Sequence, residues 1–184
     1  GCRADARARR PYFSGRRSLH ASGGPRREAG GTVRSRRYRP NHPRSVMKTR
    51  ITWLEDMSYV AQSASGHALV LDGPPELGGR NLGPRPMELL LMGMGGCTAV
   101  DVVNILRKAR QDLRGCELQL DAERADSDPK VFTTIRVHFI LTGRNLNGKQ
   151  VERAITLSAE KYCSASIMLG KTAQISHTFE IRDA

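Results

Sequence analysis

The chain has 184 residues, enough for one ordinary domain, and a formal net charge of +12. The charge is uneven: residues 1–46 contain 13 Arg and only two acids, whereas residues 47–184 contain 17 basic and 16 acidic residues. This distribution excludes a broadly basic domain, and a count of four cysteines excludes a disulfide-rich scaffold.

Residues 1–46 form an Arg-rich tail without regular apolar spacing. Its larger aliphatic residues are Leu19, Val33 and Val46, so burial of an apolar face cannot offset the entropy cost of ordering it. We expect this tail to be disordered and interpret it as leader sequence, added expression sequence or translation upstream of a mis-assigned start at Met47. An organellar transit peptide and a polybasic arm that binds phosphates are the alternatives.

The alternating pattern after the tail predicts three short strands in an antiparallel meander, at residues 48–55, 57–64 and 67–73. Ser and Gly between these segments are typical of turns. The following residues, 73–86, are rich in Gly and Pro, which indicates a loop.

Residues 87–110 predict one long helix, which Pro86 can start because proline at the first helical turn loses no hydrogen bond. The helix is apolar enough to raise the question of a membrane span. Glu88, Asp101 and Asn104 would be costly inside a bilayer, so a buried central helix is the better interpretation. Because the helix is too apolar to bury only one face, and its glycines invite close packing, we expect an obligate homodimer.

The rest of the chain predicts two strands at residues 115–124 and 131–143, a helix at 149–162 and a closing strand at 175–182. The helices are separated from the strand hairpins rather than alternating with single strands. This order predicts the α+β class.

Two cysteines occupy positions where chemistry is plausible: Cys97 within the long helix and Cys163 directly after the second helix. A free Cys is often a small buried hydrophobe, which is our interpretation of Cys116. The sequence has no CxxC and no paired His spacing, so we expect no metal and no cofactor. Asp101 lies four residues after Cys97 on the same helix face and should disfavour a Cys97 thiolate.

Two stretches make the pattern specific: GPRPMELLLMGMGGCTAVDVVNIL at residues 83–106 and SAEKYCSASIML at residues 158–169. In order, they resemble the first and second cysteine signatures of the OsmC/Ohr superfamily. The stretch TAQISHTFEI at residues 172–181 resembles the closing strand of that family, and residues 47–73 are most similar to its small YhfA-type branch. The resemblance covers residues 47–184.

The resemblance implies an OsmC-like domain at residues 47–184, with antiparallel sheets around two central helices in an intertwined homodimer. It also implies a thiol-dependent peroxidase in which Cys97 attacks an organic hydroperoxide and Cys163 resolves the sulfenic acid as a disulfide. A dithiol reductant then restores both thiols. An apolar pocket that includes Leu91 and Met94 would suit an organic hydroperoxide.

The enzymes of this family activate the attacking thiol with an Arg from the early strands and a Glu directly after the helix-opening Pro. In this chain Met87 occupies the Glu position, the acid follows as Glu88, and residues 57–72 contain no Arg. Arg85 and Glu88 are therefore the candidates for activation.

The sequence thus predicts a redox protein of oxidative-stress defence, a thiol peroxidase that is cytoplasmic and has no membrane partner. The alternative is a non-enzymatic member of the same fold that binds a small apolar ligand or senses redox state. A nucleic-acid-associated role through the tail ranks far below both.

Overall fold

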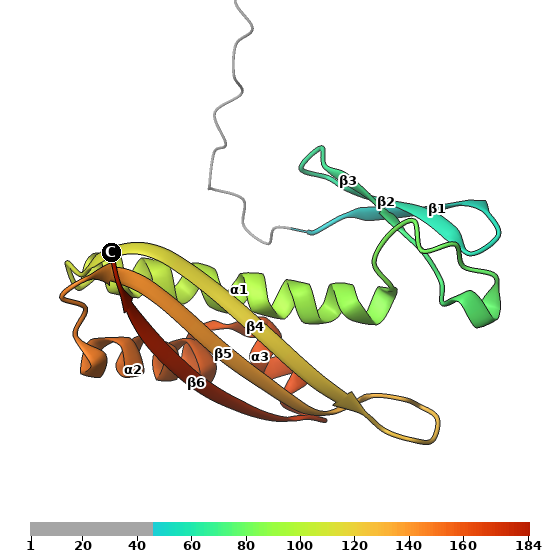
Figure 1. Ribbon diagram of the computed structural model, residues 1–184. Helices are drawn as coiled ribbons and strands as arrows, with labels where there is room; N and C mark the ends of the chain where they lie inside the picture. The colour runs from blue at the N-terminus through green and yellow to red at the C-terminus, as the bar shows by residue number, and fades with distance from the viewer. Residues whose placement is uncertain (1–45) are drawn as a thin grey trace, which may run out of the picture. The chain divides into compact units, whose positions relative to one another are not determined.

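The computed structural model describes residues 46–184, so the predicted disorder of the tail falls outside the described residues except at Val46. The described chain contains two three-stranded sheets and three α-helices, in the order βββ–α–ββ–α–α–β (Figure 1). A short 3-10 helix, η1 (Pro75–Leu77), and a π-helix, η2 (Ser158–Tyr162), complete it. The predicted α+β class is confirmed.

The first sheet is the predicted antiparallel meander of β1 (Thr49–Glu55), β2 (Ser58–Ser63) and β3 (Ala68–Leu71). Its turns include Asp56 at φ 46° and Gly66 at φ 91°, a backbone region that glycine adopts without steric cost. All seven residues of β1 are exposed in the single chain, including Trp53 and Ile51. This sheet therefore presents apolar side chains that its own chain does not cover.

The loop after β3 is organised by the buried carboxylate of Asp72. Its oxygens accept hydrogen bonds from the backbone N–H groups of Gly73 (2.8 Å), Arg80 (2.9 Å) and Leu82 (3.0 Å), and from the Ser58 hydroxyl (3.3 Å). The carboxylate thus accepts from three backbone N–H groups and one hydroxyl, and it supplies an acceptor for the loop N–H groups of Arg80 and Leu82. The Gly- and Pro-rich segment consequently has a defined path into the next helix.

The long helix α1 (Pro86–Lys108) begins at the proline that the sequence indicates. It is long and apolar enough to cross a membrane by length and composition alone. Its buried residues recur at helical spacing and pack against the second sheet and the other helices: Met94, Thr98, Val102 and Leu106. One face of α1 therefore packs into the core of the domain.

The second sheet consists of β4 (Asp112–Arg124), β5 (Phe132–Arg144) and β6 (Gln174–Asp183), in that order. The β4–β5 pair is antiparallel, as predicted, but β5 and β6 are parallel. The expectation of purely antiparallel sheets was therefore wrong for this pair. Between β5 and β6 the chain forms a helical crossover, and a crossover of that length is what a parallel pair requires.

The crossover contains α2 (Gly148–Leu157), η2 and α3 (Ser164–Leu169), where the sequence pattern predicted a single helix at residues 149–162. These helices pack with α1, and their buried side chains join those of β5 in one hydrophobic core. Figure 1 shows α1 running alongside β4 and β5, with α2 and α3 beside it. The core thus fixes α1 and the η2–α3 junction next to each other.

Candidate active site

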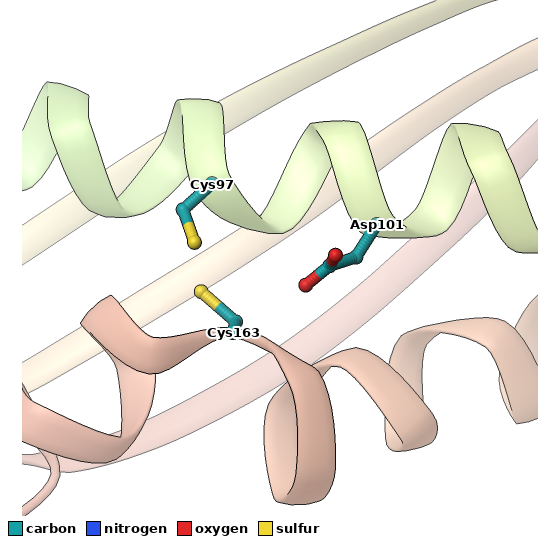
Figure 2. A group of neighbouring side chains, drawn as sticks. All are labelled: Cys97, Asp101 and Cys163. Carbon is teal, nitrogen blue, oxygen red and sulfur yellow. The ribbon is translucent and has the colours of Figure 1, made fainter. Parts of the chain in front are cut away.

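Cys97, Asp101 and Cys163 meet where α1 faces the junction of η2 and α3. Their sulfur atoms and a carboxylate oxygen all lie within 4.8 Å of one another. Figure 2 shows both sulfurs pointing toward each other and the carboxylate turned toward the same space. The structure therefore brings together the two cysteines that the sequence singles out, although 65 residues separate them.

The π-helix η2 sets the position of Cys163. The backbone N–H of Cys163 donates to the carbonyl of Ser158 at 2.8 Å, and the chain then leaves helical geometry at Cys163. Cys163 becomes the N-cap residue of α3, and its sulfur accepts from the backbone N–H of Ser166 at 3.4 Å. A π-turn at a functional site is a recurring feature of proteins, and here it aims the thiol at α1.

The sulfur of Cys163 is fully buried among hydrogen-bonding groups. The Thr98 hydroxyl lies 3.2 Å from this sulfur and 3.3 Å from the Ser166 hydroxyl. Burial alone would raise the pKa of the Cys163 thiol. The pKa is nevertheless lowered, because the hydroxyls of Ser166 and Thr98, the Ser166 N–H and the Cys97 thiol all favour the thiolate.

Cys97 has the opposite character, although it is only partly buried. Burial raises the pKa of its thiol, and the hydrogen bond to Cys163 and the negative charge of Asp101 raise it further. The pair is therefore polarised: of the two thiols, Cys163 has the lowered pKa and forms the thiolate more readily, and Cys97 has the raised pKa. The expected effect of Asp101 on Cys97 is confirmed in direction.

The carboxylate of Asp101 is held by a second residue of the junction. The Ser158 hydroxyl donates to it at 3.2 Å. Because Asp101 lies one helical turn after Cys97 and Ser158 opens η2, this bond links the two elements that carry the thiols.

Arg85 and Glu88 lie at the start of α1 and bond to each other. The Arg85 N–H donates to the Glu88 carboxylate at 2.9 Å, and the guanidinium lies 3.6 Å from the same group. Glu88 precedes Cys97 by nine residues, which corresponds to about 13 Å along a helix axis. Within one chain this pair acts as a helix cap, and its part in thiol activation stays a prediction.

A cavity of about 560 Å³ also lies at the start of α1. It is lined by Leu91 together with Arg85, Glu88, Arg124 and other residues. Met94 is instead fully buried, and its carbonyl lies 4.0 Å from the Cys163 sulfur. The two residues of the predicted pocket are therefore separated: Leu91 lines the cavity, whereas Met94 is buried in the core and does not line it.

Three residues of the site were not predicted: Thr98, Ser158 and Ser166. Ser166 follows Cys163 by three residues, the spacing of an N-cap contact, so a helix start at this point would have indicated it. Cys116 behaves as predicted, since it packs beside the core and burial raises the pKa of its thiol.

Comparison with known proteins identifies the family of the chain. A protein-family model described as "OsmC-like protein" matches residues 78–178. The chain is 47% identical over 135 residues to Protein YhfA of Escherichia coli (strain K12), covering 73% of this chain and 98% of that protein. The chain belongs to the OsmC-like family. The resemblance in the sequence, including the YhfA-type branch, is thereby confirmed.

Solved structures extend the match to the fold. A hypothetical protein from Aquifex aeolicus is 26% identical, with a TM-score of 0.67, over 77% of this chain and 99% of that one. An organic hydroperoxide resistance protein OsmC from Legionella pneumophila is 18% identical, with a TM-score of 0.58, over 74% and 97% of the two chains. At that identity the second match shows the OsmC-like fold alone.

Proposed function

We propose that this OsmC-like protein is a dithiol peroxidase that reduces organic hydroperoxides through Cys97 and Cys163. The observation that carries the proposal is the polarised thiol pair, whose sulfur atoms lie within 4.8 Å of each other. A sulfenic acid needs a thiol at this range before it oxidises further, and a disulfide preserves the sulfur for another cycle.

Cys97 is the attacking residue in this proposal because its thiol is partly exposed, whereas Cys163 is fully buried. As the Cys97 sulfur attacks the distal peroxide oxygen, its proton passes through the Cys163 thiolate to the departing alkoxide. The products are a Cys97 sulfenic acid and an alcohol. Cys163 therefore acts first as the base that accepts the proton.

The Cys163 thiolate then attacks the sulfenic sulfur of Cys97. An S–S bond forms, the S–O bond breaks, and the departing hydroxide takes a proton from solvent to become water. A dithiol reductant next reduces the disulfide, is itself oxidised to a disulfide, and returns both cysteines to the starting state.

The substrate class follows from the surroundings of the pair. Met94, whose carbonyl lies 4.0 Å from the Cys163 sulfur, is fully buried, and Asp101 contributes negative charge. An apolar hydroperoxide fits this environment better than an anionic one. The role is detoxification of such peroxides in the cytoplasm.

We further propose that the protein works as a homodimer. Leu90, Met92 and Val100 leave a second apolar face of α1 exposed, with Val100 at 70%. A Cβ added at Gly93 or Gly96 on this helix would meet no atom within 4 Å, so another backbone has room to approach closely. A second copy of the chain would cover this face and the exposed first sheet.

The test is thiol counting by mass spectrometry before and after one equivalent of cumene hydroperoxide, followed by turnover with dithiothreitol or dihydrolipoate. We expect two thiols to be lost per chain as one Cys97–Cys163 disulfide. Cys97→Ser should abolish peroxide consumption, and Cys163→Ser should permit at most one turnover. The matched control is Cys116→Ser, another free and partly buried cysteine, which should behave as the parent.

The competing function is a redox sensor or a binder of small apolar ligands. It is favoured by one observation: Arg85 and Glu88 bond to each other at the start of α1. A disulfide that forms with peroxide but is not turned over by either dithiol would support the sensor. Peroxide consumption by Cys97→Ser at the parent's rate would refute both redox roles.

A further inference from the structure

The site presents three metal-binding groups to one point. Cys97 and Asp101 project from the same face of α1, one turn apart, and Cys163 faces them from the start of α3 (Figure 2). Each offers one ligand atom, and the three atoms lie within 4.8 Å of one another. Two thiolate sulfurs and a carboxylate oxygen form a donor set that suits zinc.

The distances are close to those that zinc requires. With Zn–S bonds of about 2.3 Å and a Zn–O bond of about 2.1 Å, tetrahedral angles place the two sulfurs about 3.8 Å apart and each sulfur about 3.6 Å from the oxygen. Ligand atoms already within 4.8 Å need to close by at most about 1.0 Å between the sulfurs and about 1.2 Å between each sulfur and the oxygen, which side-chain rotation provides.

Neighbouring hydroxyls hold the ligands in orientation. Ser158 donates to the Asp101 carboxylate at 3.2 Å, and Thr98 lies 3.2 Å from the Cys163 sulfur. Hydrogen bonds of this kind orient metal ligands in known sites and contribute to their affinity.

We propose that the reduced protein binds a thiophilic divalent cation through Cys97 Sγ, Cys163 Sγ and one carboxylate oxygen of Asp101. Two metal–sulfur bonds and one metal–oxygen bond form in place of bonds from the cation to water, the thiol protons leave to solvent, and no electrons are transferred. Three protein ligands leave a fourth position for water. Because the cation occupies both sulfurs, metal binding and disulfide formation exclude each other.

This site differs from what sequence spacing indicates. Metal sites are predicted in a sequence from Cys and His residues at short, regular spacings, and this chain has no such motif. Here Asp101 and Cys97 share a helix, and the third ligand comes from a turn far along the chain. The site shares its thiols with the proposed peroxidase, but binding does not depend on that reaction.

The experiment uses the full chain, reduced and desalted under anaerobic conditions. Cobalt(II) is titrated while the thiolate-to-cobalt charge-transfer absorption is recorded, and zinc is then added to displace it in competition with a chromophoric chelator. We expect one ion per site and, in weakly buffered solution, release of up to about two protons.

Substitutions identify the ligands. Cys97→Ser, Cys163→Ser and Cys163→Ala should each weaken zinc binding by about 100-fold or more, and Asp101→Asn by about tenfold or more with a weaker cobalt–sulfur band retained. Circular dichroism checks that each variant is folded. Cys163→Ala is included because a serine hydroxyl is costly to bury at this position, and alanine avoids that cost. Cys116→Ser is the matched control and should bind as the parent.

The proposal is overturned if cobalt gives no thiolate band, if Asp101→Asn binds zinc as tightly as the parent, or if Cys116→Ser abolishes binding. The outcomes also separate it from the peroxidase. A protein that binds zinc in this way without consuming peroxide refutes the proposed function alone. One that consumes peroxide without the cobalt band refutes the metal site alone.

Discussion

Thr98→Val tests the origin of the polarised thiol pair. Valine resembles threonine in shape but lacks the hydroxyl, so the substitution removes the hydrogen-bonding group that lies beside the Cys163 sulfur and the Ser166 hydroxyl. The lowered pKa of the Cys163 thiol depends in part on this hydroxyl, after the larger effects of burial and Ser166. We therefore expect the Cys163 pKa to rise in the variant.

The magnitude follows from the hydrogen bond that is lost. Such bonds to charged groups contribute about 1.5–3 kcal/mol. Since the Thr98 hydroxyl is shared with Ser166 and other donors to the sulfur remain, the lower end applies, and about 1.4 kcal/mol changes the thiolate population about tenfold. A group with a lowered pKa is charged above that pKa, so the loss of thiolate should be largest between the Cys163 pKa of the parent and that of the variant, and should disappear in strong alkali.

The assay is a pH titration of far-ultraviolet thiolate absorbance in the Cys116→Ser background, together with the rate of peroxide consumption. The variant's titration should move to higher pH, and its rate near neutral pH should fall by up to about tenfold. Thr172→Val is the matched control, because Thr172 is exposed and its hydroxyl donates to the carbonyl of Leu169 at 3.3 Å. If Thr98→Val and Thr172→Val both titrate as the parent does, the hydroxyl does not stabilise the thiolate.

Three further predictions concern the fold and the assembly. Asp72→Asn should lower the melting temperature at neutral pH. Backbone N–H donation, chiefly from Leu82, lowers the Asp72 pKa, so the carboxylate stabilises the fold at neutral pH and this stabilisation is lost on acidification through that pKa. A parent and a variant that melt alike at neutral and at acidic pH would contradict this. Leu106→Ala should reduce the free energy of unfolding by about 2–5 kcal/mol in denaturant titrations, because the side chain is fully buried; a change below 1 kcal/mol, roughly, would argue against its place in the core. Val100→Arg should give a monomer by light scattering while circular dichroism stays native, and a persistent dimer would exclude this face of α1 as the interface.

The sequence predicts most of the fold because its strongest patterns are local. Pro86 and the apolar run after it define α1, and alternation defines the strands of both sheets. Strand direction is not encoded in the same way. The alternation of β6 is compatible with parallel or antiparallel pairing, and the direction is decided by the helical crossover before it.

The site is predicted less completely than the fold. Cys97 and Cys163 are identifiable only through the family signatures, since nothing local connects two residues on separate helices. The pattern at residues 149–162 also continues smoothly through the π-helix, so it does not reveal the turn that aims Cys163 at α1. Helical spacing predicts that Asp101 lies next to Cys97, but the hydrogen bond from Ser158 to Asp101 depends on tertiary packing.

The polarity of the thiol pair constrains how it can react. The pKa of the more accessible thiol, Cys97, is raised, and the pKa of the buried thiol, Cys163, is lowered. In the proposed reaction, attack by Cys97 requires that its proton move to Cys163, so one ionisation of the pair, rather than two independent ones, should control the rate. Under that proposal, removing Cys163 has two effects, because it eliminates both the proposed resolving thiol and the proposed base. Cys163→Ser should accordingly form the sulfenic acid more slowly than the parent in its first turnover, and an unchanged first-turnover rate would mean that another group accepts the proton.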